Sequence, residues 1–149
     1  MYKNILVPTD GSPLSLKAAK EAARLAKAQK ARITGYYAIA PFVSPPTGEA
    51  YIMSPELFSE KEYTKRMQKF AGEALSEIEA EVKKAGVEFE ATSDVAGAPW
   101  KGIIDAVQSK GCDLVVMASH GRRGLEGLLL GSETMKVLTH SKTPVLVCR

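Results

Sequence analysis

Short apolar runs alternate with longer amphipathic segments along the whole chain, and most of them end at proline, glycine or polar clusters. Five of the runs predict β-strands: Lys3 to Pro8, Arg32 to Ala40, Val87 to Ser93, Cys112 to Ser119 and Thr143 to Cys148. The first run is apolar and β-branched before its proline, which is typical of a strand buried on both faces.

The segments between these strands carry apolar residues at helical spacing. Ser12 is the expected N-cap of the first helix, with Pro13 at its first position. The predicted helices span Pro13 to Gln29, a long segment through Tyr63, Met67 and Phe70 that ends at Gly86, a short segment within Gly97 to Gly111, and Ser132 to Thr139. We expect the aromatic and methionine residues of the long helix to belong to the core. Three prolines and a glycine predict a loop from Pro41 to Ser54.

Strands that alternate with helices predict one α/β domain over residues 1–149, in which a parallel sheet carries helices on both faces. Right-handed crossovers favour a Rossmann-like, doubly wound five-stranded sheet of order 3-2-1-4-5. The chain then reverses its direction across the sheet between strands 1 and 4. Open sheets of this kind bind ligands at such a reversal, outside the carboxyl ends of the strands.

Composition narrows the possible partners. A net charge of +3, spread along the chain, argues against a nucleic-acid surface. No run of about 18 apolar residues predicts a membrane span, and the first residues do not resemble a signal peptide, so we expect a cytoplasmic protein. Cys112 and Cys148 have no metal-binding spacing and are expected to be reduced.

Glycines are concentrated after the fourth strand, at Gly121, Gly124, Gly127 and Gly131. In the predicted sheet this segment meets "PTDGS", which follows the first strand. Gly131 and Ser132 open the last helix, where free N–H groups and the helix dipole favour an anion. The residues alone leave two alternatives, a loop that cradles phosphate and a bare flexible turn. Walker, GxGxxG, GxSxG and HExxH motifs are absent from the sequence.

The segments "KNILVPTDGS", "DLVVMASHGRRGLEGLLLGSETMKVL" and "TPVLV" resemble the universal stress protein family over nearly the whole chain. In its nucleotide-binding branch the loop has glycine, two residues, glycine, nine residues, then glycine and serine or threonine. The later positions match Gly121, Gly131 and Ser132, but the first glycine falls on Ala118. Alanine is compatible with the loop if this position is extended, and is not if a left-handed turn is needed.

The resemblance implies a stress-response sensor or regulator that binds ATP, expected with magnesium. It places adenosine against Pro8, Thr9, Asp10 and Ala38, and the ribose and phosphates along Ala118, Gly121, Gly131 and Ser132. The expected site also includes Met117, His120, Arg122, Glu133 and Thr134. His120 is expected to order the turn, and Gly124 and Gly127 to give flexibility. Two alternatives stay open for Arg122 and Arg123: they reach the phosphates, or they are solvated loop charges, which is the commoner role of such a pair.

Two other functions remain open: a slow ATPase or related nucleotidyl-transfer enzyme, and a dimeric interaction module that binds no nucleotide. The apolar, uncharged strand from Pro144 to Cys148 lies at the edge of the predicted sheet. An open edge of this kind invites pairing with another chain, and the resemblance agrees. We therefore expect a homodimer through this strand, with no nucleic-acid or membrane partner.

Overall fold

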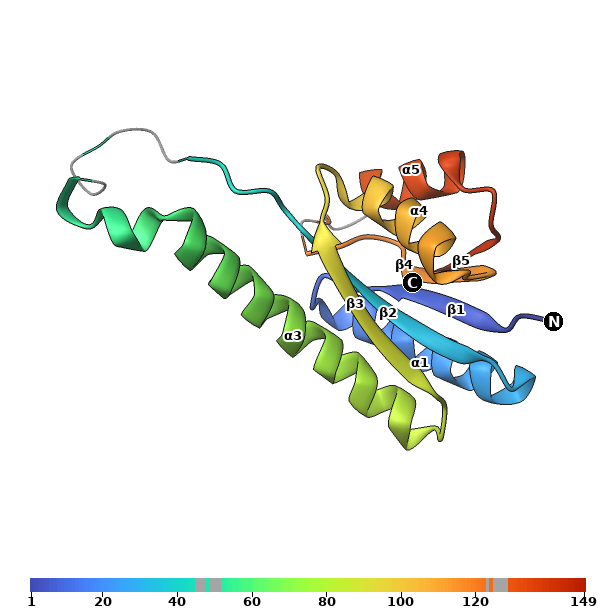
Figure 1. The fold of residues 1–149 in the computed structure, drawn as a ribbon. Coiled ribbons are helices and arrows are strands. Elements are labelled where there is room, and N and C mark those ends of the chain that lie inside the picture. Colours follow the sequence, from blue (N-terminus) through green and yellow to red (C-terminus); the bar gives the residue numbers. More distant parts are fainter. Residues whose placement is uncertain (45–47, 49–51, 123, 125–128) are drawn as a thin grey trace.

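A computed structural model describes residues 1–44, 48, 52–122, 124 and 129–149. All five predicted strands are present in one parallel sheet of order β3-β2-β1-β4-β5, so the predicted topology is confirmed (Figure 1). The strands are β1 (Asn4–Pro8), β2 (Arg32–Ile39), β3 (Phe89–Val95), β4 (Leu114–Ala118) and β5 (Val145–Cys148). The helices are α1 (Pro13–Gln29), α3 (Glu60–Lys84), α4 (Pro99–Lys110) and α5 (Ser132–His140), with a 3₁₀ turn η1 (Pro55–Phe58).

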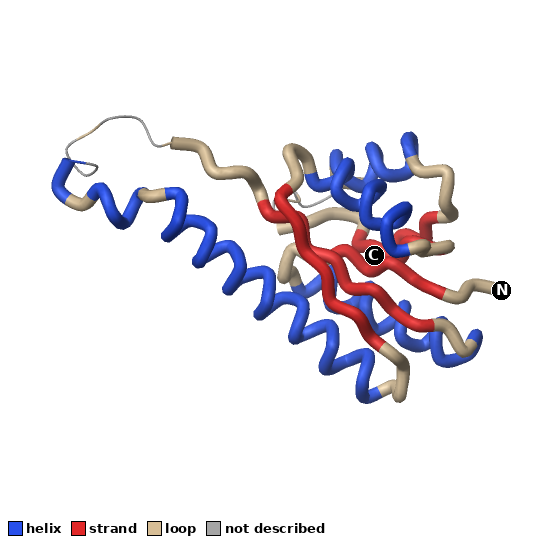
Figure 2. Tube along the Cα trace, in the orientation of Figure 1, coloured by secondary structure: helices blue, strands red, loops and turns tan. Residues whose placement is uncertain are grey.

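Helices cover both faces of the sheet, α1 and α3 on one side and α4 and α5 on the other (Figures 1 and 2). Because side chains alternate along a strand, β1 sends Ile5 and Val7 into the α1–α3 core and Leu6 into the α4–α5 core. All three are fully buried. The central strand is therefore enclosed on both faces, as its apolar sequence predicts.

Capping residues define α1 as the sequence predicts. The Ser12 hydroxyl accepts a hydrogen bond from the Ser15 N–H, and Pro13 occupies the first turn. The helix ends at Lys30, which adopts a left-handed conformation with φ 57°. The N-cap at Ser12 fixes where α1 begins, and so keeps the short loop after β1 at the carboxyl end of the sheet.

The long helix α3 corrects one expectation. Its carboxyl half packs on the sheet through residues such as Ala74, Ile78 and Val82, but Phe70 is 49% exposed. Figure 1 shows the amino-terminal end of α3 extending past the end of the sheet. Helical spacing predicts one apolar face but not how far the sheet extends beneath it.

The predicted loop from Pro41 to Ser54 lies partly outside the described residues, which omit 45–47 and 49–51. Residues 41–44 form neither helix nor strand, and residues 52 and 53 are helical. Cys112 and Cys148 are both free thiols, as expected. Among the residues placed by the structure, no helix is both long and apolar enough to span a bilayer.

Candidate functional site

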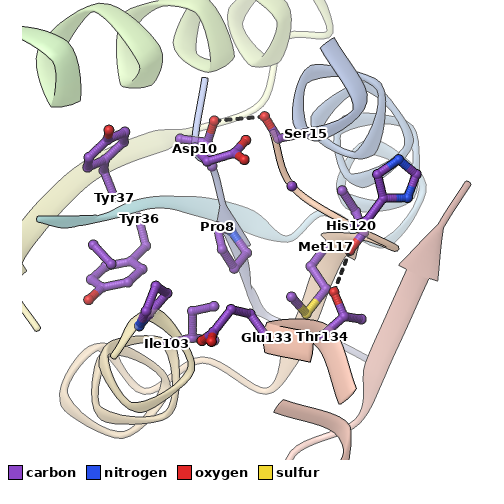
Figure 3. A pocket seen from close by; sticks show the side chains of 15 residues that line it. Pro8, Asp10, Ser15, Tyr36, Tyr37, Ile103, Met117, His120, Glu133 and Thr134 are labelled. Carbon is purple, nitrogen blue, oxygen red and sulfur yellow. Dashed lines mark hydrogen bonds between the residues drawn. The ribbon is translucent and has the colours of Figure 1, made fainter. Parts of the chain in front are cut away.

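A cavity of about 200 Å³ opens at the carboxyl ends of β1, β2 and β4, where the sheet reverses (Figure 3). Its polar side chains come from the loops after β1 and β4 and from α1, β2 and α5. Its apolar side chains come from α4 and from the ends of β1, β2 and β4. The lining residues are Pro8, Thr9, Asp10, Ser15, Tyr36, Tyr37, Ala38, Pro99, Ile103, Met117, Ala118, His120, Gly121, Glu133 and Thr134. The cavity therefore lies at the place that the doubly wound topology predicts for a ligand.

The structure brings together most of the residues that the sequence nominates. Those that line the cavity are Pro8, Thr9, Asp10, Ala38, Met117, Ala118, His120, Gly121, Glu133 and Thr134. Arg122 instead lines an adjoining cavity beside the start of α1. Gly131 and Ser132 are the N-cap and first residue of α5, and neither lines the cavity.

Sequence reasoning missed five lining residues: Ser15, Tyr36, Tyr37, Pro99 and Ile103. The tyrosines had a usable signal, because they precede Ala38 at the carboxyl end of a predicted strand. Pro99 and Ile103 had none, because only tertiary packing brings the start of α4 to the cavity. The Tyr36 ring is held by its own hydroxyl, which donates to Asp94 Oδ1 at 2.6 Å.

Asp10 joins the two loops that form the polar side of the cavity. Its Oδ1 accepts from the Ser12 N–H at 2.9 Å, and its Oδ2 accepts from the Arg122 N–H at 2.8 Å. Partial burial acts to raise the pKa of Asp10, but the hydrogen bonds from Ser12 and Arg122 outweigh it and leave that pKa below its usual value. Asp10 is therefore an ionised clamp at neutral pH.

The clustered glycines make room for Asp10 and His120. A β-carbon on Gly121 would lie 2.6 Å from Asp10 Oδ2, and one on Gly124 would overlap His120 Cδ2. A β-carbon on Gly131 would lie 3.1 Å from His120 Cα, while the φ of Gly131 is −73°. Glycine is therefore required at position 131 because His120 packs close to it, and not because the backbone has a positive φ. Gly124 has a steric role in addition to the expected flexibility. Gly127 and Arg123 lie outside the described residues.

His120 lies in the turn after β4 that it is expected to order. Its Nδ1 lies 3.1 Å from the hydroxyl of Ser119, which is buried. The Ser119 N–H donates to the Cys148 carbonyl, and the Ser119 carbonyl accepts from the Gly131 N–H, both at 2.7 Å. These bonds fix the start of the loop and bring Gly131, with the first turn of α5, close to the end of β4.

Glu133 connects α5 to α4. Its Oε2 accepts from the Trp100 N–H at 2.8 Å, in the first turn of α4. Ala98, the N-cap of α4, offers no side-chain bond, so the carboxylate takes over the capping role. Thr134 is also structural, since its buried hydroxyl donates to the Ala118 carbonyl at 3.0 Å.

The backbone of Ala38 presents an unused hydrogen-bonding edge at the cavity. The Thr9 N–H donates to the Tyr36 carbonyl at 2.9 Å, so Tyr36 directs its backbone groups toward β1. Ala38, two residues further, directs its N–H and carbonyl to the same side. There β1 has already ended at Pro8, and the Gly11 N–H is taken by the Thr9 hydroxyl. Among the described residues, neither backbone group of Ala38 pairs with the segment after β1.

The family model for universal stress proteins matches residues 1–149. The chain belongs to the universal stress protein family. Universal stress protein MJ0531 of Methanocaldococcus jannaschii is 34% identical over 151 residues, covering 100% of this chain and 83% of that protein. The solved structure of MJ0577, from the same organism, has 30% identity and a TM-score of 0.79, covering 99% of this chain and 96% of that one. A universal stress protein in complex with cAMP has 28% identity and a TM-score of 0.72, covering 99% and 97%.

In this universal stress protein, Ala118 stands where the family loop has its first glycine. Ala118 is the last residue of β4 and pairs with Cys148 of β5, so its backbone is extended. Lys30 is the only non-glycine residue of the described chain with a positive φ. The left-handed turn that alanine would resist is therefore not required at this position.

Proposed function

We propose that this universal stress protein binds ATP in the cavity and acts as a stress-response sensor or regulator whose state depends on nucleotide occupancy. The unpaired backbone edge of Ala38, placed beside an apolar slot, is the observation that carries the proposal. The relative in complex with cAMP supports an adenine nucleotide as the ligand class. A cytoplasmic location remains a prediction from the sequence.

The Ala38 edge suits adenine better than guanine. Adenine presents an N6 amino donor next to the N1 acceptor, which complements one carbonyl and one N–H. Guanine held in the same orientation by its ribose presents the opposite order, a carbonyl acceptor next to an N1–H donor, and would face like groups. Pro8, Ile103 and Met117 supply apolar surface for the faces of the base.

The start of α5 is the proposed position for the phosphates. The Gly131 N–H is already bonded to Ser119, so the free N–H groups of the first turn begin at Ser132, whose side chain is exposed. Within the ranges that the structure describes, no group of three or more metal-ligating side chains forms a metal site. Magnesium would therefore be held mainly by the phosphates of ATP, with Asp10 or Glu133 as the nearby carboxylates.

We also propose a homodimer through β5. Leu146 on β5 is 44% exposed, and Met135 and Leu138 on the neighbouring α5 are 49% and 39% exposed. Leu146 lies on the α1 face of the sheet and the other two on the α5 side, so apolar surface flanks the open strand edge on both faces. A second copy would cover this combination. A two-fold pair of antiparallel β5 strands would continue the sheet across both subunits.

The direct test is the nucleotide content of the purified protein. Denaturation followed by chromatography is expected to release ATP. Incubation of the ATP-bound protein over hours then distinguishes an ATP-binding regulator from a slow ATPase, because the regulator retains ATP while the ATPase releases phosphate. The purified protein could instead carry no adenine nucleotide and show no change in melting temperature with ATP and magnesium. That result would contradict the proposal and favour a dimeric interaction module that binds no nucleotide.

A further inference from the structure

The charged side chains that line the cavity are both acidic. Asp10 and Glu133 stand on opposite sides of it, as Figure 3 shows, and no lysine or arginine is among the described lining residues. Asp10 is compensated by two backbone N–H donors. Glu133 is the carboxylate closest in sequence to the proposed phosphate position, one residue after Ser132.

Glu133 competes with a phosphate for the favourable field at the start of α5. It is the acidic residue in the first turn of that helix, where the helix dipole stabilises negative charge. Its counter-ion is Lys136, whose Nζ lies 3.5 Å from Oε1 and whose side chain is 48% exposed. An exposed pair of this kind gives little net compensation. A phosphate placed beside Glu133 therefore meets a fixed negative charge.

We propose that Glu133 is a specificity-determining residue that ranks adenine nucleotides by the negative charge of their phosphates. The inference rests on the proposed adenine-nucleotide function. Adenosine carries no phosphate charge and binds without this penalty, and cAMP carries less charge than ATP. ATP meets the largest repulsion, which a divalent cation on its phosphates relieves. Occupancy by ATP is then conditional on the cation, whereas occupancy by adenosine is not.

The hydrogen bond to Trp100 gives Glu133 a second role that must be separated from its charge. Glu133→Gln keeps an amide oxygen that can accept from the Trp100 N–H, yet it removes the charge. Glu133→Ala removes both and leaves α4 uncapped. The first variant tests electrostatic ranking, and the second tests whether Glu133 only positions the α4 wall of the cavity. Glu62→Gln is a matched control for the charge change, because Glu62 is also an acidic residue in the first turn of its helix, α3.

Titration calorimetry with adenosine, cAMP and ATP, each in EDTA and in excess magnesium, tests the inference. In EDTA, Glu133→Gln should bind ATP about tenfold more tightly than wild type, with adenosine affinity unchanged. Magnesium should increase the ATP affinity of Glu133→Gln less than that of wild type, and Glu62→Gln should behave as wild type. Equal changes for adenosine and ATP, or no change for either, would overturn the ranking while leaving the proposed function intact. A wild-type protein that binds none of the three ligands would overturn the proposed function, and this inference with it.

Discussion

The carboxylate of Asp10 accepts a hydrogen bond from the backbone N–H of Arg122 at 2.8 Å, although 112 residues separate the two along the chain. The bond ties the loop after β1 to the loop after β4, at the point where the sheet reverses. One ionised side chain thus holds both loops at the mouth of the cavity. It also explains Gly121, whose missing β-carbon leaves space for the carboxylate.

Replacing Asp10 with asparagine should destabilise the protein at neutral pH. If its amide oxygen bonds Ser12, its NH₂ group faces the Arg122 N–H, so one hydrogen bond to a charged acceptor is lost. The expected cost in unfolding free energy is about 1–2 kcal/mol, which urea titration measures.

The difference in stability between wild type and Asp10→Asn should depend on pH. The folded-state pKa of Asp10 is lowered, so its stabilisation is fully present above the unfolded value and is lost as the pH falls through the folded one. The stability gap between wild type and Asp10→Asn should therefore be constant near neutrality and narrow from about pH 3.8 downward. A gap that stays constant into strong acid would contradict the role of the ionised clamp.

Gly124 and His120 should be coupled sterically. Gly124→Ala would place a methyl group on the His120 ring, forcing it to rotate away from Ser119 at a cost of about 1–2 kcal/mol. In a His120→Ala background the same substitution should be nearly neutral. A double-mutant cycle by thermal or urea unfolding checks this coupling. Additive effects of the two substitutions would show that the ring and residue 124 do not touch in solution.

The free edge of β5 can be blocked without disturbing β4. The carbonyls of Pro144 and Cys148 accept from β4-side residues, so the backbone N–H groups of Val145 and Val147 point outward. Val147→Pro should convert the proposed dimer to a folded monomer, because proline removes an outward donor. Val147→Ala keeps that donor and should remain dimeric. Light scattering reports the mass, and a Val147→Pro protein that is still dimeric would place the interface elsewhere.

The order of the sheet could be predicted because its signals are local. Each strand is a short apolar run, Ser12 and Pro13 mark the start of a helix, and right-handed crossovers leave few arrangements. The same topology places Asp10, Ala38 and Gly121 at one edge, so the centre of the cavity was also predictable.

Contacts between distant elements could not be predicted. Nothing near Glu133 in the sequence indicates that it caps α4 at Trp100, and the position of Ile103 depends on how α4 packs. Phe70 has the spacing of a core residue but is 49% exposed. The glycines signalled an unusual backbone, yet the reason lies in the side chains of Asp10 and His120.

Calorimetric titration of nucleotide-free protein with ATP and with GTP, both in magnesium, tests the central claim most directly. The unpaired N–H and carbonyl of Ala38 match the edge of adenine and oppose that of guanine. We predict saturable binding of ATP, with GTP weaker by at least about tenfold, because mismatched donors and acceptors leave buried polar groups unpaired. Equal affinity for the two nucleotides, or no heat of binding from either, would contradict an adenine site at Ala38.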